Sequence, residues 1–505
     1  MSSIKRLTDR LTRWGARTVA VVDNQWGDAG KGKIVDSLAE WADIIARGTG
    51  GANAGHTIII GGETHVFHLV PSGILWDGQG KVNVIGRGVA VEPCTLAGEI
   101  GELAAVGNHC AGLRISHHAH LVLPIDIALD RLKEAGAGAS AIGTTGRGIG
   151  PVYESWLARI GLTANDLLNK DVFAKKLSRN WAARKWLFRQ YDPEVVKAVL
   201  GSEALESGVF YGGSEKVFDL DAIVERYTLH AKTFRDMLVD TDVLMARAVG
   251  RKNVLLEGAQ GVLLSVSYGT YPYVTSSDCS LAGLAEGVGL RTRNVDYVLS
   301  VVKAPYMTRV GKGPFPTELG GHVSAEWCST EEARKGPERE KYPQASVNSS
   351  DSLEQGVAIR QAGNEYGATT GRPRRVGWLD LPLLRYAAQY GSSKLALTKV
   401  DVLNDCKVIW LCVQYRYEGD DYRVGDRQLR RGDFLGVAIM DAYVMEHCTP
   451  VYLALPGWCR DLSGIRSVED LPPELLSIVG AIESRANVTV DVLSIGPDRN
   501  ETIVF

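Results

Sequence analysis

The feature that most constrains the fold is a β-branched run followed by a glycine-rich loop and a helical pattern. TVAVVD at 18–23 predicts a strand, and in the following NQWGDAGKGK glycines alternate with Lys31 and Lys33. Such a loop presents backbone N–H groups and the positive end of a helix dipole to phosphate. The Walker A pattern is not matched literally, because Ile34 follows Lys33. A plain strand-to-helix turn with exposed lysines is the alternative interpretation.

Similar β-branched runs alternate with helical patterns along the chain. We therefore predict an α/β fold in which a large, mainly parallel central sheet is flanked by helices. The glycine-rich loop after its first strand makes the predicted fold similar to P-loop GTP-binding folds, and we expect it to carry insertions. Between strands, residues 220–249 predict a helix with Ile223, Tyr227, Phe234 and Leu238 on one face. The predicted strands are 18–23, 82–86, 254–257, 297–304, 394–399 and 408–413.

The chain divides into three parts by composition. We expect an N-terminal extension at 1–17, which is a short helical lead-in, and a single catalytic domain at 18–505. Within that domain the stretch at about 320–365 is charged, rich in Ser and poor in core residues. This composition predicts a solvated or flexible insertion.

Charge and cysteine content limit the class of protein. The net charge of -3 lacks the basic excess of a dedicated nucleic-acid binder. No apolar run is long enough to span a bilayer. The eight cysteines contain no CxxC pair and predict reduced thiols rather than a disulfide framework or a zinc site. We expect a cytoplasmic enzyme that binds neither nucleic acid nor membrane.

Asp28 lies inside the predicted phosphate loop, where a carboxylate is unfavourable unless it has a use. It could be a ligand for Mg²⁺ that bridges phosphates. It could also be a base that takes a proton from the substrate. A helix-capping aspartate is the structural alternative.

Three further glycine-rich segments carry polar side chains. In GTGGANAGHTI, His56 could donate to a phosphate oxygen, although a lone histidine is more often a packed residue. In AIGTTGRGIGP, Thr145 and Arg147 suit a nucleotide phosphate, and a surface turn is the alternative. In EGAQG, the amide of Gln260 suits a purine edge or a simple turn.

Two later segments predict recognition of carboxylate and of base. Arg372, Arg374 and Arg375 surround a glycine, and their guanidinium groups could bind a dicarboxylate; a solvated basic loop is the alternative. In LALTKVD an apolar strand precedes Lys399 and Asp401. The aspartate could accept from N1–H and the 2-amino group of guanine while the lysine stem lies over the base, which favours GTP over ATP. The segment resembles the [NT]KxD signature of GTP-binding proteins.

Taken in order, the motifs of the chain closely resemble those of the adenylosuccinate synthetase family. The matching segments are WGDxGKGK, NAGHT, IGTTGRGIGP, EGAQG, TYPYVTSS, TRVGKGPFPTEL, GATTGRxRR, GWLD, TKxDVL and SxGPDR. The resemblance implies a ligase of purine biosynthesis that forms a C–N bond. IMP, L-aspartate and GTP would give adenylosuccinate, GDP and phosphate through 6-phosphoryl-IMP, with Mg²⁺, in a homodimer with shared active sites.

Residue roles follow from the matching motif positions. The resemblance implies that Asp28 is the base at the purine N1, His56 the acid and Lys31 a charge neutraliser, with Gln260 also catalytic. Mg²⁺ would be held by Asp28 and Gly55. IMP would contact Asn53, Thr145, Arg159 from the partner subunit, Gln260, Thr275, Val310 and Arg372. L-Aspartate would contact Thr369, Thr370 and Arg372. GTP would contact Gly27, Gly30, Lys31, Gly32, Lys33, Gly55, His56, Thr57, Arg374, Lys399, Asp401, Ser494 and Gly496.

Three positions depart from the family pattern beside these loops. Asp23, Ala29 and Ala52 stand where the family usually has Gly, Glu and His. The changes leave open a variant substrate such as GMP or dGMP, which would give the 2-amino analogue. The retained Asp28 favours IMP, because inosine chemistry needs a base at N1. A GTP-regulated binding module and an inactive homologue are the two alternatives from other classes.

Overall fold

A ten-stranded sheet forms the centre of the molecule in the computed structural model. The structure describes residues 3–60, 63–77, 79–192, 195–196, 198–199, 219–330, 332–367 and 371–505. Neighbouring strands run parallel throughout, except that β21 is antiparallel to β20. In sheet order the strands are β21 (Thr502–Val504), β20 (Thr489–Ser494), β14 (Lys394–Thr398), β11 (Tyr297–Lys303), β1 (Thr18–Asp23), β10 (Val254–Glu257), β2 (Ile44–Arg47), β5 (Val82–Ile85), β7 (Leu113–Ser116) and β9 (Leu238–Val239).

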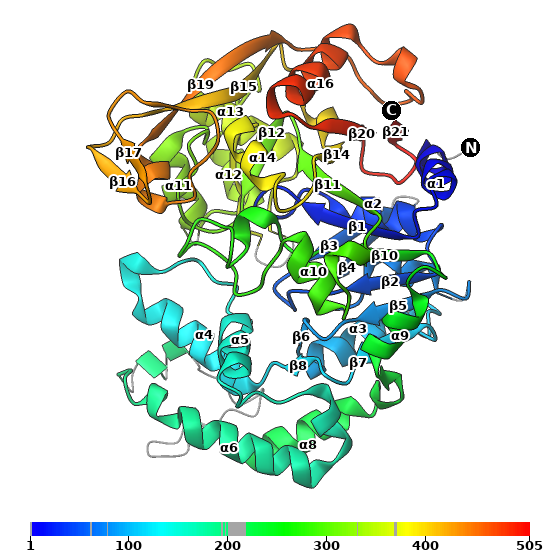
Figure 1. The fold of residues 1–505 in the computed structure, drawn as a ribbon. Coiled ribbons are helices and arrows are strands. Elements are labelled where there is room, and N and C mark those ends of the chain that lie inside the picture. The colour runs from blue at the N-terminus through cyan, green and yellow to red at the C-terminus, as the bar shows by residue number, and fades with distance from the viewer. Residues whose placement is uncertain are drawn as a thin grey trace.

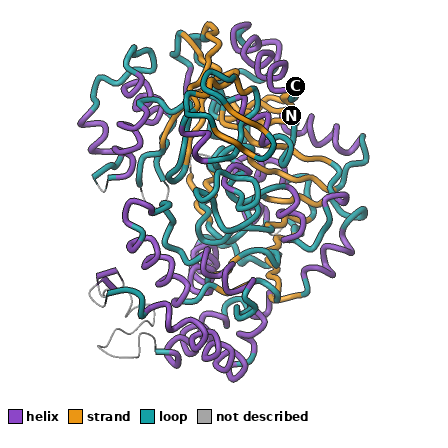
Figure 2. Tube along the Cα trace, turned by 60° about the vertical axis from the view of Figure 1, so that its left-hand side comes forward, coloured by secondary structure: helices purple, strands orange, loops and turns teal. Residues whose placement is uncertain are grey.

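Helices cover both faces of the sheet (Figures 1 and 2). Helices α1 (Ser3–Arg13) and α2 (Lys31–Ala39) pack on one face of β1, and α9 (Thr241–Ala248) and α10 (Leu281–Gly287) on the other. The other described helices are α3 (Pro93–Ala105), α4 (Pro124–Gly136), α5 (Ile149–Leu157), α6 (Lys170–Phe188), α8 (Leu220–Ala231), α11 (Gly321–Ser329), α12 (Lys335–Lys341), α13 (Ser352–Ala362), α14 (Leu381–Ala387), α15 (Ala442–Glu446) and α16 (Pro473–Ala486). None of these helices is both long and apolar enough to cross a membrane, among the residues that the structure describes.

Smaller sheets and 3₁₀ turns surround this centre. The pairs are β3 (His56–Ile60) with β4 (Glu63–Phe67), β6 (Ala90–Val91) with β8 (His120–Leu121), β12 (Tyr306–Arg309) with β13 (Arg375–Trp378), and β16 (Tyr422–Val424) with β17 (Arg427–Leu429). A three-stranded sheet contains β18 (Phe434–Leu435), β15 (Val408–Tyr417) and β19 (Cys448–Pro456). The 3₁₀ turns are η1 (Ser72–Trp76), η2 (Gly138–Ser140), η3 (Ala164–Leu168), η4 (Arg235–Met237), η5 (Val262–Leu264), η6 (Thr292–Asn294), η7 (Val400–Leu403) and η8 (Val468–Asp470).

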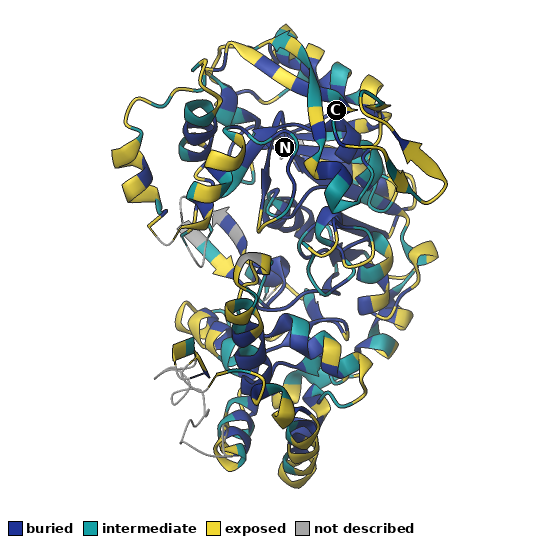
Figure 3. Cartoon of the chain, turned by 90° about the vertical axis from the view of Figure 1, so that its left-hand side faces the viewer, coloured by how far each residue is buried: buried dark blue, intermediate teal, exposed yellow. Residues whose placement is uncertain are grey.

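Strand β1 explains why the central strands are apolar along their whole length. Val19 and Val21 pack in the core shared with α1 and α2, whereas Ala20 and Val22 pack in the opposite core with α9 and α10. Successive side chains of a strand point to opposite faces, so a strand buried on both sides must be apolar at every position. Figure 3 shows these strands in the buried class, with exposed residues on the outer helices.

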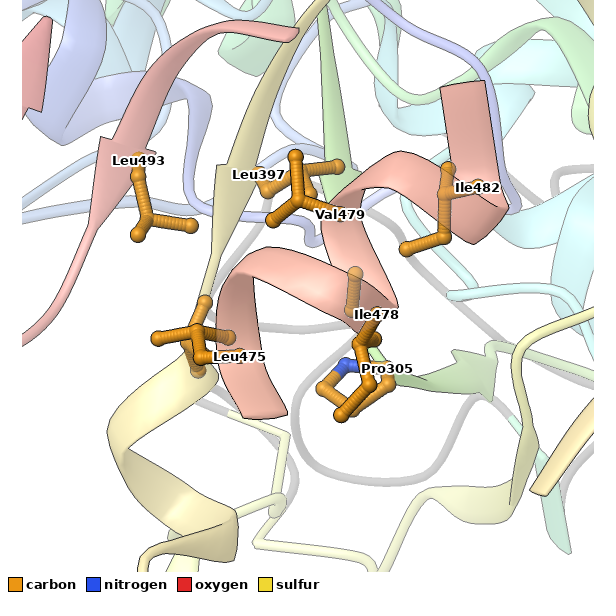
Figure 4. Close-up of a pocket in the computed structure, with 9 residues that line it drawn as sticks. Pro305, Leu397, Leu475, Ile478, Val479, Ile482 and Leu493 are labelled. Atoms are coloured by element: carbon orange, nitrogen blue, oxygen red, sulfur yellow. The ribbon is translucent and has the colours of Figure 1, made fainter. Parts of the chain in front are cut away.

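Helix α16 shows how a helix is fixed to the sheet. Figure 4 shows Leu475, Ile478, Val479 and Ile482 of α16 pointing toward β14 and β20. The apolar gap between them has a volume of only ≈ 10 Å³. A dry space of this size is a small packing defect and cannot hold a ligand.

The predicted fold class is confirmed, and so are the strands that begin at Thr18, Val82, Val254, Tyr297 and Lys394. The run at 408–413 also forms a strand, β15, but it belongs to the separate three-stranded sheet. The predicted helix at 220–249 was wrong as one element. It divides into α8, η4, β9 and α9. Phe234 is buried in the turn after α8, and Leu238 is partly buried in strand β9.

The N-terminal extension and the insertion at about 320–365 both contain helices. Helix α1 buries Ile4, Leu7 and Leu11 against the central sheet, so the lead-in is part of the main core. The stretch at 320–365 contains α11, α12 and α13. Most described residues at 321–352 are exposed, as the solvated interpretation expects, but the stretch forms helices and contains the buried ion pair of Glu338 and Arg360.

Candidate active site

The loops at the carboxyl ends of the parallel strands form the candidate active site. Parallel strands end at the same edge of a sheet, which is where open α/β folds bind ligands. Four of the predicted motifs lie at the ends of these strands: the phosphate loop at β1, the His56 loop at β2, EGAQG at β10, and TKVD at β14. AIGTTGRGIGP instead lies between α4 and α5, and the arginine segment at 367–375 lies after α13. The sheet therefore gathers segments that are distant in the sequence.

The phosphate loop turns tightly between β1 and α2. Gly27, Asp28 and Gly30 have φ values of 81°, 61° and 86°, so three residues adopt the left-handed conformation. A non-glycine residue at positive φ is uncommon, and aspartate is one of the few that tolerates it. A Cβ at Gly27 would lie 3.3 Å from the Gln260 Cα, so glycine lets this loop approach the loop after β10.

Asp23 stabilises the conformation of the same loop by accepting hydrogen bonds from it. Its buried carboxylate accepts hydrogen bonds from the backbone N–H groups of Gln25 at 2.8 Å and Ala29 at 3.3 Å. It also accepts from the ammonium group of Lys31 at 3.0 Å. Lys31 therefore lies in the loop as predicted, but it is paired within the protein.

The carboxylate of Asp28 meets a buried charge network on the opposite side. Asp28 pairs with Arg374, whose Nη1 donates to the Glu365 Oε2 at 2.8 Å. Lys303, at the end of β11, donates to the same oxygen at 2.8 Å. Burial opposes ionisation of Glu365, but Lys303 and Lys399 outweigh it and hold its pKa below the ordinary value. The network fixes the Arg374 guanidinium beside Asp28.

His56 is oriented by a second buried carboxylate. Its Nδ1 pairs with Glu257, the last residue of β10. Ser72 holds Glu257 in turn, through Oγ at 2.6 Å and the backbone N–H at 2.8 Å. The Nε2 of His56 is buried without a partner among the described residues. Burial lowers the pKa of His56, and the Glu257 carboxylate opposes this shift.

Gln260 presents an unpaired amide to the site. The residue has φ 48°, and both side-chain polar atoms are buried without a hydrogen-bond partner in the described part of the chain. Buried polar groups are almost always paired, so this amide is available to bind a further polar group. A Cβ on Gly50 would lie 2.9 Å from the Gln260 Oε1. Nearby, the Asn53 Nδ2 donates to the Thr275 Oγ1 at 3.4 Å.

The predicted guanine segment is joined to the phosphate loop. Thr398 donates through Oγ1 to the carbonyl of Ala29 at 2.7 Å. Lys33 donates to the Ser494 Oγ at 2.7 Å and the Gly496 carbonyl at 2.6 Å. Burial lowers the pKa of Lys33 to about 8. Lys33 therefore binds the C-terminal loop within the protein.

The end of β14 leads directly into this segment. Lys399 has φ 61° and donates to the Gly363 carbonyl at 2.7 Å. Burial raises the pKa of Asp401 in η7. These two residues, with Ser494 and Gly496, lie where TKVD and SIGPD adjoin.

The remaining predicted residues lie around this centre. Thr145 and Arg372 are exposed, and so is Gly55. The loop of Thr145 lies beside Val310, because a Cβ on Gly143 would lie 3.5 Å from the Lys312 nitrogen. Thr369 and Thr370 fall outside the described residues, as does the side chain of Thr57. Arg159, at the end of α5, is exposed with φ 60°.

The sequence reasoning missed Glu257, Lys303 and Glu365 as parts of the site. A signal existed for the first two, since each is a charged residue at the end of an apolar strand. Glu365 gave no such signal, because it follows α13 and is separated from Lys303 by 62 residues.

A parallel sheet with a glycine-rich phosphate loop, an oriented histidine and a buried, unpaired amide defines a nucleotide-dependent α/β enzyme. The family model described as adenylosuccinate synthetase matches residues 20–503. The chain belongs to the adenylosuccinate synthetase family, whose members are ligases that form a C–N bond.

Individual relatives support this assignment over nearly the whole chain. The adenylosuccinate synthetase of Moorella thermoacetica is 42% identical over 491 residues, covering 96% of this chain and 98% of the relative. That of Geobacillus kaustophilus is 38% identical over 489 residues, covering 96% and 98%. The fully ligated adenylosuccinate synthetase of Plasmodium falciparum has a TM-score of 0.76 and 31% identity, covering 97% of this chain and 100% of that one.

A more distant structure shares the fold alone. It is the succinoaminodeoxyadenylate synthetase of cyanophage S-2L, bound to dGMP and to dATP as an energy donor. Its identity is 17% and its TM-score 0.51, with coverage of 96% and 94%.

Proposed function

We propose that this chain joins L-aspartate to IMP at the expense of GTP, and that the loops at the carboxyl edge of the sheet perform both steps. GTP phosphorylates the purine 6-oxygen, and the amine of aspartate then displaces phosphate to give adenylosuccinate. The observation that carries the proposal is the position of Asp28, which belongs to the phosphate loop and pairs with Arg374. Across the same loop, Gln260 presents its unpaired amide.

Asp28 acts as the base in the first step. Removal of the N1 proton places negative charge on the 6-oxygen, which attacks the γ-phosphorus of GTP. The left-handed backbone directs the carboxylate out of the loop, and Arg374 fixes its orientation. Gln260 binds the purine edge, because its amide can both donate and accept.

His56 and Lys31 stabilise charge on the transferred phosphoryl group. Glu257 accepts from Nδ1 of His56 and favours the imidazolium form, in which Nε2 can donate to a phosphate oxygen. Phosphoryl transfer depends mainly on positioning and charge stabilisation. In the free protein the Lys31 ammonium group donates to Asp23. When the nucleotide binds, the ammonium group also donates to the phosphates.

The donor groups of the loop also suit Mg²⁺. Asp28 offers a half-buried carboxylate and Gly55 an exposed carbonyl, and both are hard oxygen ligands. No cluster of three His, Cys, Asp or Glu side chains suited to a metal occurs among the described residues, so phosphate oxygens would complete the coordination. Bound Mg²⁺ supplies electrostatic stabilisation of the phosphates. We propose Asp28 and Gly55 as its protein ligands.

The other substrates occupy the flanking loops. Lys399 and Asp401 bind guanine, with Ser494 and Gly496 beside it, and Arg374 lies near the GTP. The phosphate loop binds the GTP phosphates through Gly27, Gly30, Gly32 and Lys33, with Thr57 beside them. The segment of Thr369, Thr370 and Arg372 binds the carboxylates of aspartate. IMP contacts Asn53, Thr145, Thr275 and Val310, together with Arg372.

The functional unit that we propose is a cytoplasmic homodimer. Arg159 follows α5, has a left-handed backbone conformation and is exposed. Its side chain is therefore accessible to a second subunit. It would reach the IMP of the partner's active site. Each site would then contain groups from two chains.

A substrate panel tests the proposal directly. IMP, GMP, dGMP and XMP would each be supplied with L-aspartate and Mg²⁺, with GTP or ATP as phosphoryl donor. We expect GDP and phosphate to form only when IMP, aspartate and GTP are present together. Faster turnover of GMP or dGMP would instead assign the variant reaction, and GDP release without aspartate would exclude ligation.

A further inference from the structure

The insertion at about 320–365 contains a fully buried carboxylate on an otherwise exposed helix. In α12, Glu338 has 0% exposure, whereas the residues on either side of it, Pro337 and Arg339, are exposed. A glutamate is almost never buried unless it is paired. The position of Glu338 therefore has a specific structural cause.

Three side chains satisfy both oxygens of Glu338. The Arg360 Nε lies 3.0 Å from each oxygen. Tyr366 donates its hydroxyl to Oε2 at 2.6 Å, and the Trp327 Nε1 donates to Oε1 at 2.7 Å. These partners come from α11, from α13 and from the segment after α13, which are grouped together in Figure 1.

The same cluster connects to both ends of the loop that precedes β13. At one end is Tyr366, which also forms an antiparallel bridge with Pro373. At the other end, the Arg360 Nη1 donates to the carbonyl of Arg374 at 2.8 Å. The backbone of Arg374 is thus held by Arg360, while its side chain reaches Asp28 and Glu365.

The energetics indicate a positional role for this pair. A buried ion pair loses about as much in desolvation as it gains, and an apolar replacement is often equally stable. The pair does provide a fixed geometry, because the planar guanidinium matches the carboxylate at two points. That geometry determines where the Arg374 carbonyl lies.

We propose that Glu338 is a positioning residue for the amino-acid step. Through Tyr366, which bridges to Pro373, and through Arg360, which binds the Arg374 carbonyl, it fixes the backbone on the C-terminal side of Arg372. The inference rests on the proposed function, in which Arg372 binds aspartate. The insertion would thereby set the affinity of the enzyme for the amino-acid substrate. Glu338 itself touches no substrate.

The test compares Glu338→Gln with Glu340→Gln, a matched change at an exposed position of the same helix. We expect Glu338→Gln to raise the KM for aspartate by roughly tenfold, since small displacements of binding groups have effects of this size or larger. The KM values for GTP and IMP should rise by a smaller factor than the KM for aspartate, because most of their proposed contacts lie on other loops. Glu340→Gln should match the wild type in all three constants.

A second, milder variant shows whether the effect persists when the protein remains folded. Tyr366→Phe removes one hydroxyl from Glu338 and should raise the KM for aspartate in the same direction but less. Assays would be run well below the melting temperature of each variant. Lower kcat with unchanged KM values would reflect a loss of folded protein and would overturn the positioning role.

The outcomes also separate this inference from the proposed function. Wild-type enzyme that releases no GDP with IMP and aspartate would refute the proposed function. Active wild type with Glu338→Gln and Tyr366→Phe variants of unchanged aspartate KM would refute the inference alone.

Discussion

At the scale of single residues, Asp28 joins the phosphate loop to the buried network around Glu365. Its left-handed φ of 61° turns the side chain away from the loop backbone. Arg374 holds the carboxylate from the other side while also binding Glu365. The residue thus has a fixed orientation, which general base catalysis requires.

Asp28→Asn should preserve this geometry while removing the base. Asparagine also tolerates the left-handed conformation and has nearly the same volume. We expect kcat to fall by about 10²- to 10⁴-fold, the typical contribution of a positioned base, with the affinity for GTP in the absence of Mg²⁺ nearly unchanged. Steady-state kinetics and a GTP titration measure the two effects. Asp236→Asn, at an exposed site, is the control; a variant with nearly normal kcat would remove Asp28 from the base role.

Residue types in glycine-rich loops allowed part of the site to be predicted from sequence. Asp28, His56 and Gln260 were predicted from the polar side chains of such loops, and the structure places all three at the carboxyl edge of the sheet. Their partners could not be predicted in the same way. Lys303 and Glu365 pair over 62 residues of sequence, and Ser72 and Glu257 over 185. Only the folded topology brings such groups together.

At the scale of elements, the junction between β13 and α14 contains a buried carboxyl group, Asp380, whose pKa is raised. Asp380 caps α14 by accepting from the Leu383 N–H at 3.0 Å, and Tyr415 donates to its other oxygen at 2.6 Å. Burial raises the pKa of Asp380 from 3.8 to about 7. Deprotonation at this position therefore opposes folding.

This shift predicts a pH-dependent effect of Asp380→Asn. Because the folded pKa is raised, the stabilisation is fully present below about pH 4 and is lost as pH rises to about 7. Asparagine cannot ionise, so the stability of the variant relative to wild type should rise between about pH 5 and 7 and level off above. Urea unfolding at several pH values measures this. Asp441→Asn, at the half-buried cap of α15, is the matched control; a constant difference would contradict the prediction.

Elements were predicted well where one face or both faces are continuously apolar. Strands β1 and β10 begin and end at the predicted residues. The segment at 220–249 was predicted poorly, because a helical spacing of apolar residues hid a turn and a short strand. In the insertion, most described residues at 321–352 are exposed as the composition indicated, but the buried pair of Glu338 and Arg360 was not predicted. Composition does not reveal which charges form pairs.

At the scale of the whole molecule, the central sheet determines which segments meet. Strands β2, β10, β1, β11, β14 and β20 are neighbours in that order, and each ends beside a loop of the candidate site. Their order in the sheet differs from their order in the sequence. The site is consequently a property of the complete domain.

A shared active site would make two inactive variants complement each other. In a dimer of Arg159→Ala and Asp28→Asn chains, one site carries both changes and the other carries neither. Random mixing of equal amounts should therefore restore about a quarter of wild-type activity, because half of the dimers are mixed. Activity is measured after the variants exchange subunits. Activity no higher than the mean of the separate variants would exclude sharing of Arg159.

Helix α1 and strand β21 lie against each other, with Arg10 donating to the carbonyl of Phe505 (Figures 1 and 2). A short peptide would therefore suffice to splice Ser3 to Phe505 and close the backbone into a ring. Reopening that ring in the outlying hairpin of β16 and β17 would leave every neighbour in the central sheet unchanged. The geometry thus makes circular permutation feasible, with a new attachment point for fused proteins in a hairpin that carries none of the proposed site residues.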